Sequence, residues 1–230
     1  GKTNMANANT AGYGCRQTMT VGNTPATGGQ SEFLVQGGAA PGATIAIFKG
    51  DPVGNQTAAG GPGAVGFIQD QAALAMTDTV TGGLAWTLAA GTNPSLGVFN
   101  GATFVDVTGK PTWTNGLAAG QTSDTDYNTG SNNITAFVNT NPLQEYTVRA
   151  DAALTNASFN TLTNVGFNLN NVGAGVNGQS DCTLDMAAVA GTANYMWKIV
   201  RSANVMDQQD LTVAGADVIV TYSNNANAYN

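Results

Sequence analysis

Three side-chain oxygens at alternate positions form the pattern in this sequence that most resembles a metal site. Asp124, Asp126 and Asn128 lie in the stretch SDTDYNTG, which ends in a glycine. Alternate residues of a tight loop can turn their oxygens toward one cation, as they do in calcium loops. The stretch therefore carries the donor atoms that a hard cation such as Ca²⁺ would need.

The spacing does not match that of an EF-hand loop. Such a loop needs glycine at its sixth position and a bidentate glutamate at its twelfth. Counted from Asp124, these positions hold Thr129 and Thr135, and the glycine arrives one residue late. Asp and Asn also form side-chain-to-backbone turns without any ion. We therefore predict a polar surface loop and treat the metal site as the less favoured alternative.

The residue types of the chain leave little room for catalysis. No histidine occurs, which removes Ser-His-Asp and Cys-His catalysis and most zinc chemistry. Two cysteines, Cys15 and Cys182, cannot complete a thiolate metal site, and we expect free thiols rather than a disulfide. A glycosidase-like carboxylate pair would have to draw on Glu32 and Glu145, the two glutamates of the chain. We therefore predict that the protein is not an enzyme and needs no cofactor.

Composition argues against nucleic-acid and membrane partners. Charged residues are 9% of the chain, against about 25% in an ordinary soluble domain, and the net charge is −7. Nucleic-acid binders need clustered Lys and Arg, but the basic residues here are scattered. There is neither a basic amphipathic stretch nor a run of about 20 apolar residues. The polar start, GKTNMANANT, has no hydrophobic signal region, so we expect synthesis and folding inside the cell.

Strand signals dominate the chain. Short runs rich in β-branched and aromatic residues alternate with Gly, Asn, Pro and Asp turns, at the spacing of a sandwich or barrel. In one run, Tyr146, Val148 and Ala150 should share a face. We predict an all-β fold, an antiparallel β-barrel or β-sandwich of roughly ten strands with long polar loops.

Three local features are predicted in more detail. Asn100-Gly101 can adopt the positive φ angles of a type I′ turn, which predicts a hairpin there. Ile68–Asp78 is predicted to form one short helix, and Ser180–Val189 to add a helical turn.

One β domain is expected, flanked by an irregular segment. Residues 1–14 are polar and aperiodic, which predicts an extended N-terminal arm. Residues 15–230 then form a single domain with a long polar loop at 115–133, since loops of that length are usually functional or disordered.

Short motifs spread along the chain, in a consistent order, resemble a family of small structural proteins of tailed bacteriophages. Members of this family are capsid decoration (cement) proteins or other virion proteins. The motifs are Asn7-Ala8-Asn9, Gly12-Tyr13-Gly14, Phe48 with Gly50-Asp51-Pro52-Val53, Gly97-Val98-Phe99 with Gly101 and Asp106, Phe137-Val138, Asn141-Pro142, Tyr146-Thr147-Val148, Val165-Gly166-Phe167-Asn168 and Trp197-Lys198-Ile199.

The resemblance implies a cement protein on the outer surface of an icosahedral phage head, assembled in the host cytoplasm. Its partner would be the major capsid protein, and it would act as a homotrimer near threefold axes or, as the runner-up, as a dimer. An arm of this kind orders on binding, so contact area must offset its entropy. The arm residues expected to contact the capsid are Lys2, Asn4, Asn7, Asn9 and Tyr13.

Two other functions are kept as alternatives. The chain could be another phage component, such as a tail-tube or neck protein, because tube proteins are also β-rich. It could also be a carbohydrate-binding β-sandwich in which Trp86, Trp113 or Trp197 stacks on sugars, although tryptophans of β proteins are more often part of the core.

Overall fold

Strands account for all regular secondary structure in the described part of the chain, which confirms the predicted all-β fold. No helix there is long and apolar enough to cross a membrane. The computed structural model describes residues 6–26, 29–35, 46–55, 67–70, 95–106, 108–117, 135–154, 166–172, 175–190 and 197–222.

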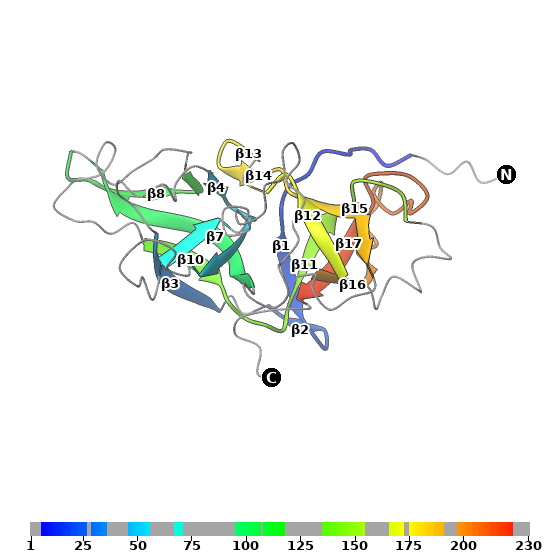
Figure 1. Ribbon diagram of the computed structural model, residues 1–230, viewed down its shortest axis with the longest axis horizontal. Coiled ribbons are helices and arrows are strands. Elements are labelled where there is room, and N and C mark those ends of the chain that lie inside the picture. Colours follow the sequence, from blue (N-terminus) through cyan, green and yellow to red (C-terminus); the bar gives the residue numbers. More distant parts are fainter. Residues whose placement is uncertain are drawn as a thin grey trace.

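Two curled sheets lie side by side, and strand β1 runs between them (Figure 1). The first sheet consists, in spatial order, of β15 (Thr183–Ala190), β12 (Gly166–Asn170), β16 (Trp197–Ser202), β17 (Asp217–Tyr222), β11 (Gln144–Arg149), β1 (Arg16–Thr20) and β2 (Thr24–Pro25). A two-residue bridge between Ala150 and Leu184 brings the end of β11 to β15, so the sheet curls around its own core.

Aromatic rings fill the core of the first sheet. Trp197 stacks on Tyr222 with ring centroids 4.6 Å apart, and both rings lie edge-on to Tyr146 at 5.6 Å. The Tyr222 hydroxyl donates to the Tyr146 hydroxyl at 3.1 Å. Burial raises the pKa of both phenols, so both stay protonated and uncharged. Tyr146, Val148 and Ala150 all face this core, as their alternation predicts.

The second sheet has its own, smaller core. Its strands, in spatial order, are β10 (Thr135–Asn139), β3 (Gln30–Val35), β6 (Phe67–Asp70), β5 (Pro52–Asn55), β7 (Ser95–Val105) and β8 (Pro111–Thr114). Because β10 also pairs with β7, the order β10-β3-β6-β5-β7 returns to its first strand. Pairing among the described strands is antiparallel except between β3 and β6. Val98 of β7 belongs to the core of the first sheet, so the two cores meet at this strand.

The predicted hairpin at Asn100-Gly101 is wrong, because β7 continues through both residues as one strand. Phe137 and Val138 of β10 lie opposite the residues on either side of Asn100, which is therefore the extra residue of a β-bulge. Strand β7 pairs with β5 before the bulge and with β8 after it. The Asn-Gly pair thus lets one long strand change neighbours instead of reversing the chain.

The glycine of the bulge is required by an aromatic neighbour. Gly101 has a φ of 134°, and a Cβ there would lie 2.3 Å from the ring of Trp113. Trp113 covers this glycine and packs at 5.3 Å from the ring of Phe137. The Trp113 ring thereby fills the space above Gly101 that a side chain at this position would otherwise occupy.

Both helix predictions are wrong where the structure describes them. Phe67–Asp70 forms β6 instead of the start of a helix, and residues 71–78 lie outside the described part. Ser180 ends strand β14 (Gln179–Ser180), and Thr183–Ala190 forms β15. The cause is tertiary pairing: β6 and β15 are hydrogen-bonded to neighbouring strands, which outweighs weak local helix propensity.

Two further strand pairs lie beside the sheets. β4 (Ile47–Phe48) pairs with β9 (Gly116–Leu117), and β13 (Gly175–Val176) pairs with β14. The start of the predicted 115–133 loop is therefore ordered by β9, whereas residues 118–133 lie outside the described part.

Each sheet has an edge strand that carries a proline. Pro25 ends β2, the edge of the first sheet, and Pro111 begins β8, the edge of the second. Proline has no N–H to donate to a further strand, so it is tolerated at such edges.

Replacing a core leucine of the first sheet should cost far more stability than replacing an exposed one. Leu184 is fully buried, and we expect Leu184→Ala to lower the free energy of unfolding by about 2–5 kcal/mol. The matched control is Leu143→Ala, where the side chain is 58% exposed and a change within about 0.5 kcal/mol is expected. Urea denaturation of both variants measures this, and equal losses would contradict the assignment of the core.

Candidate functional site: the junction between the two sheets

Three chain segments that are distant in sequence meet between the two sheets. Backbone hydrogen bonds run from Gly14 N to Cys182 O (3.1 Å), from Cys15 N to Gly50 O (2.9 Å) and from Ser180 N to Lys49 O (3.0 Å). We call the residues 12–15, 48–51 and 179–182 the junction. It joins the entry to β1 in the first sheet to the turn before β5 in the second.

A buried carboxylate lies at the centre of the junction. Asp51 is fully buried; its Oδ2 accepts from Phe48 N at 2.8 Å, and its Oδ1 accepts from the Ser180 hydroxyl. The same hydroxyl oxygen accepts from Cys182 N at 3.0 Å. An ionised carboxylate is costly to bury unless hydrogen bonds surround it, and here two of the three segments provide them.

Glycine is required where the junction backbones approach each other most closely. A Cβ on Gly12 would lie 1.9 Å from the carbonyl oxygen of Asp181, which no side chain can tolerate. Gly50 has a φ of 100°, in the region that L-residues rarely adopt. The motifs Gly12-Tyr13-Gly14 and Gly50-Asp51-Pro52 therefore have a structural explanation in the contact between segments.

Tyr13 is buried between two arginines. The guanidinium carbon of Arg16 lies 4.1 Å from its ring centroid and that of Arg149 lies 4.8 Å away, both in cation–π contact. Arg149 also pairs with Asp217, with 2.9 Å between Nε and Oδ1. Burial raises the pKa of the Tyr13 phenol, and the Asp217 carboxylate raises it further. The expected capsid-contact residue Tyr13 is thus part of the protein's own core.

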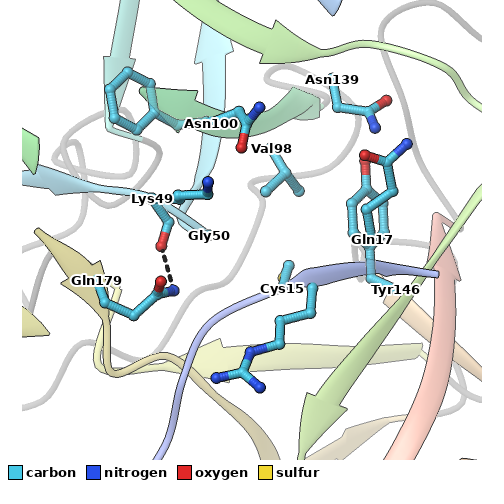
Figure 2. Close-up of a pocket in the computed structure, with 11 residues that line it drawn as sticks. Cys15, Gln17, Lys49, Gly50, Val98, Asn100, Asn139, Tyr146 and Gln179 are labelled. Atoms are coloured by element: carbon cyan, nitrogen blue, oxygen red, sulfur yellow. Dashed lines mark hydrogen bonds between the residues drawn. The ribbon is translucent and has the colours of Figure 1, made fainter. Parts of the chain in front are cut away.

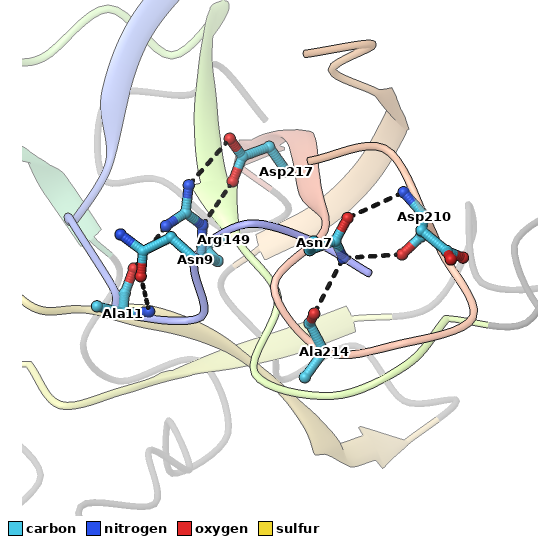
Figure 3. Close-up of polar contacts among 7 residues, drawn as sticks. All are labelled: Asn7, Asn9, Ala11, Arg149, Asp210, Ala214 and Asp217. Atoms are coloured by element: carbon cyan, nitrogen blue, oxygen red, sulfur yellow. Dashed lines mark hydrogen bonds and ion pairs between the residues drawn. The ribbon is translucent and has the colours of Figure 1, made fainter. Parts of the chain in front are cut away.

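The side chain of Asn7 is bound by a loop near the C-terminal end of the chain (Figure 3). Its Nδ2 donates to the carbonyl oxygens of Asp210 and Ala214, each at 2.9 Å, and its Oδ1 accepts from Asp210 N at 3.1 Å. Ala8 N donates to Asp207 O at 3.0 Å, which adds a backbone contact. All the donors and one acceptor of the Asn7 amide are therefore used within the chain.

The loop that binds Asn7 is ordered by a carboxylate of its own. Oδ1 of Asp210 accepts from the Thr212 hydroxyl and from Thr212 N, at 2.6 and 2.9 Å. These hydrogen bonds hold the pKa of Asp210 below its ordinary value. The carboxylate therefore stays charged at a pH where the same residue in the unfolded chain begins to take up a proton.

The N-terminal segment from Asn7 to Tyr13 differs from the free arm that the sequence predicts. Asn7 and Tyr13 are engaged within the chain, whereas Asn9 is exposed and its Oδ1 accepts only from Ala11 N nearby. Lys2 and Asn4 lie outside the described residues. The segment is fixed because Arg149 donates to Ala11 O at 2.9 Å and Asn7 is bound at the other end.

Among the residues that the structure describes, no other sequence-predicted site residues are brought together. Asp124, Asp126 and Asn128 lie outside the described residues, and the described residues contain no group of three carboxylates or thiols that could hold a metal. Glu145 is buried and accepts from Arg201 at 3.0 Å, while Glu32 lies exposed on the other sheet. Cys15 and Cys182 are buried free thiols.

The three tryptophans differ in accessibility. Trp197 is fully buried in the first core, so it offers no surface to a sugar. Trp113 is 50% exposed on β8, and its indole N–H donates to Asn115 at 3.1 Å. Trp86 lies outside the described residues.

Sequence reasoning missed the residues that bind the N-terminal segment. Arg149 and Asp217 lie opposite each other on β11 and β17, and their pairing connects positions 68 residues apart. The available signal was their position: each is a charged residue at one end of a largely buried strand, and such residues are seldom buried unless paired.

Comparisons with known proteins give no match. No family model matches the sequence, and neither a curated protein nor a solved structure matches it.

Removing the carboxylate at the centre of the junction should destabilise the protein. We expect Asp51→Ala to lower the free energy of unfolding by about 3 kcal/mol, because the buried donors Phe48 N and the Ser180 hydroxyl lose their acceptor. Asp106→Ala is the matched control: Asp106 also accepts from backbone and hydroxyl donors of a turn, but it lies at the surface. Urea denaturation that ranks Asp106→Ala as equally damaging would refute the central role of Asp51.

Loss of the Asn7 side chain should release the N-terminal segment. In Asn7→Ala we expect the hydrogen-exchange protection of the Ala8 amide to fall about tenfold, since three hydrogen bonds to the loop are lost. Asn9→Ala removes only a contact within the segment and should leave that protection unchanged. Equal protection in the two variants would show that Asn7 does not hold the segment in place.

Proposed function

We propose that this chain is a structural virion protein, a decoration (cement) protein that binds the outer surface of an icosahedral phage head and stabilises the shell. The observation that carries this proposal is that the motifs of the phage-family resemblance come together in space. Gly14 lies against the backbone of Gly50, and Cys15 N, next to it, donates to Gly50 O at 2.9 Å, although the two motifs are far apart in the sequence. Motifs that build a rigid joint are suited to a protein whose work is mechanical.

Rigidity is the property that a cement protein requires. A clamp between capsid subunits resists expansion only if its own parts do not move against each other. The junction supplies a backbone hydrogen bond from Cys15, which precedes β1, to Gly50, which precedes β5, and the buried side chain of Asp51 bonded to Ser180 lies beside it. Repetition over a symmetric shell then multiplies a modest contact into a large total effect.

The capsid-contacting surface that we propose differs from the predicted arm, because Asn7 and Tyr13 are engaged within the chain. Exposed apolar side chains gather where β1 and β2 meet the turn before β11. Met19, Val21 and Leu143 are 42, 51 and 58% exposed, and Val21 N donates to Leu143 O at 2.8 Å. Contact with the major capsid protein would bury these side chains, with Asn9 as a further exposed contact. We propose a homotrimer as the bound form and a dimer as the alternative.

The surface charge is consistent with a position outside the shell. The net charge of −7 would be repelled by packaged DNA, and the scarcity of lysine and arginine leaves few sites for trypsin-like proteases.

The experiment that tests the proposal is quantitative mass spectrometry of purified particles from the source, with the copy number of this chain compared with that of the major capsid protein. A ratio near equimolar is expected for a decoration protein. A handful of copies per particle would replace the proposal with a tail or neck role. Complete absence from particles would overturn the virion role.

Carbohydrate binding is the second candidate, and one observation favours it. Trp113 presents half of its surface to solvent and is held in orientation by Asn115 and Phe137, as a stacking platform requires. Only this function predicts that glycans change the tryptophan fluorescence, and that Trp113→Ala abolishes the change.

A further inference from the structure

A cavity of about 270 Å³ lies between the two sheets, next to the junction (Figure 2). Its walls come from the start of β1, the turn before β5, and strands β7, β10, β11 and β14. This volume is just below the roughly 300–1,000 Å³ of pockets for drug-sized ligands. The space therefore fits a compact molecule of about ten non-hydrogen atoms rather than a polymer.

One wall of the cavity carries a buried hydrogen-bond donor without a partner. Asn139 is 3% exposed, and its Oδ1 accepts from Asn141 N at 3.2 Å, which fixes the orientation of the amide. The Nδ2 group then has no acceptor among the described residues. Buried donors are nearly always satisfied, because an unpaired one costs the free energy of its lost hydration. An acceptor atom inside the cavity would satisfy it.

The charge along the walls is positive. Lys49 and Arg16 line the cavity, and none of the described residues that line it is a carboxylate, in a chain whose net charge is −7. The Arg16 guanidinium lies over the ring of Tyr13, whereas Lys49 has no ion-pair partner among the described residues. Lys49 is thus the cation available to a bound group. A metal cation would find no anionic ligand here.

The rest of the surface is mostly apolar. Val98, Phe99 and Tyr146 are almost completely buried and contribute to the lining. An inorganic anion such as phosphate would leave this surface without a partner. A molecule with an apolar body and one anionic end would match both parts of the lining.

We propose that the cavity binds a small organic carboxylate. The carboxylate accepts from Nδ2 of Asn139 and lies within the field of Lys49, while the apolar body packs against Val98 and Tyr146. Both sheets contribute to this site, so an occupied cavity would brace the junction. The proposal does not depend on the virion role, and it holds equally for a protein that binds glycans.

Benzoate is a suitable probe, because it combines an aromatic body with one carboxylate. In an NMR titration of the full chain we expect saturable shifts of the Asn139 side-chain amide, with a dissociation constant of about 1 mM or tighter. Asn139→Asp keeps the acceptor for Asn141 N but removes the donor, and it identifies the amide signal by its loss. Benzoate should not bind this variant, as followed by the backbone amides of Val98 and Tyr146.

Charge is tested separately. Lys49→Gln should weaken benzoate binding by about tenfold. Lys198→Gln is the matched control, since Lys198 is exposed on β16, does not line the cavity, and undergoes the same change of charge. Both variants keep the core intact, so a change in affinity reports the site.

Three results would overturn the proposal. The first is an Asn139 amide that stays unshifted at saturating benzoate, because the cavity would then hold only water. The second is neutral benzyl alcohol binding as tightly as benzoate, which would remove the role of the carboxylate. Finally, equal affinities of Lys49→Gln and Lys198→Gln would show that Lys49 does not act on the ligand.

Discussion

The buried carboxylate of Asp51 is the interaction on which the placement of the two sheets depends. It accepts from Phe48 N within its own turn and from the Ser180 hydroxyl of the segment that leads into β15, so the turn before β5 cannot move away from that segment without breaking a buried hydrogen bond. Hydrophobic contact alone would permit sliding, because it is not directional. A hydrogen-bonded buried side chain fixes one geometry, and the glycines around it allow the backbones to come close enough to form these bonds.

Charged residues are only 9% of the chain, and several of them form ion pairs that fix the position of β11. Two ion pairs lie on the side of β11 that faces away from the aromatic core: Arg149 with Asp217, and Arg201 with Glu145. Each pair connects β11 to another strand. Arg149 also reaches the N-terminal segment through Ala11 O. The Arg149–Asp217 pair is buried on both sides; such a pair adds little net stability, but breaking it is costly, so it selects a single arrangement. The exposed surface is left to amides and hydroxyls.

Local pattern was sufficient for the fold class and for the inward face of β11, because period-two alternation depends only on neighbouring residues. It failed wherever pairing with a distant strand decided the outcome. Asn100-Gly101 has the composition of a hairpin turn, yet β10 alongside it makes it a bulge. Likewise, the residues next to Asn7 in the sequence do not predict its contact with the loop at Asp210 and Ala214. The residues next to Asn139 do not predict the cavity. Contacts between residues more than a hundred positions apart leave no local trace in one sequence.

Prolines at the edges of both sheets have a consequence for crowded surroundings. At Pro25 and Pro111 the outermost strands lack an N–H that an approaching strand would need. When copies of this chain lie side by side at high local density, the prolines hinder these edge strands from pairing into one continuous sheet. Contacts between neighbouring molecules must then be made by side chains instead of by backbone strand pairing at these edges, and each molecule keeps its own fold even when closely packed.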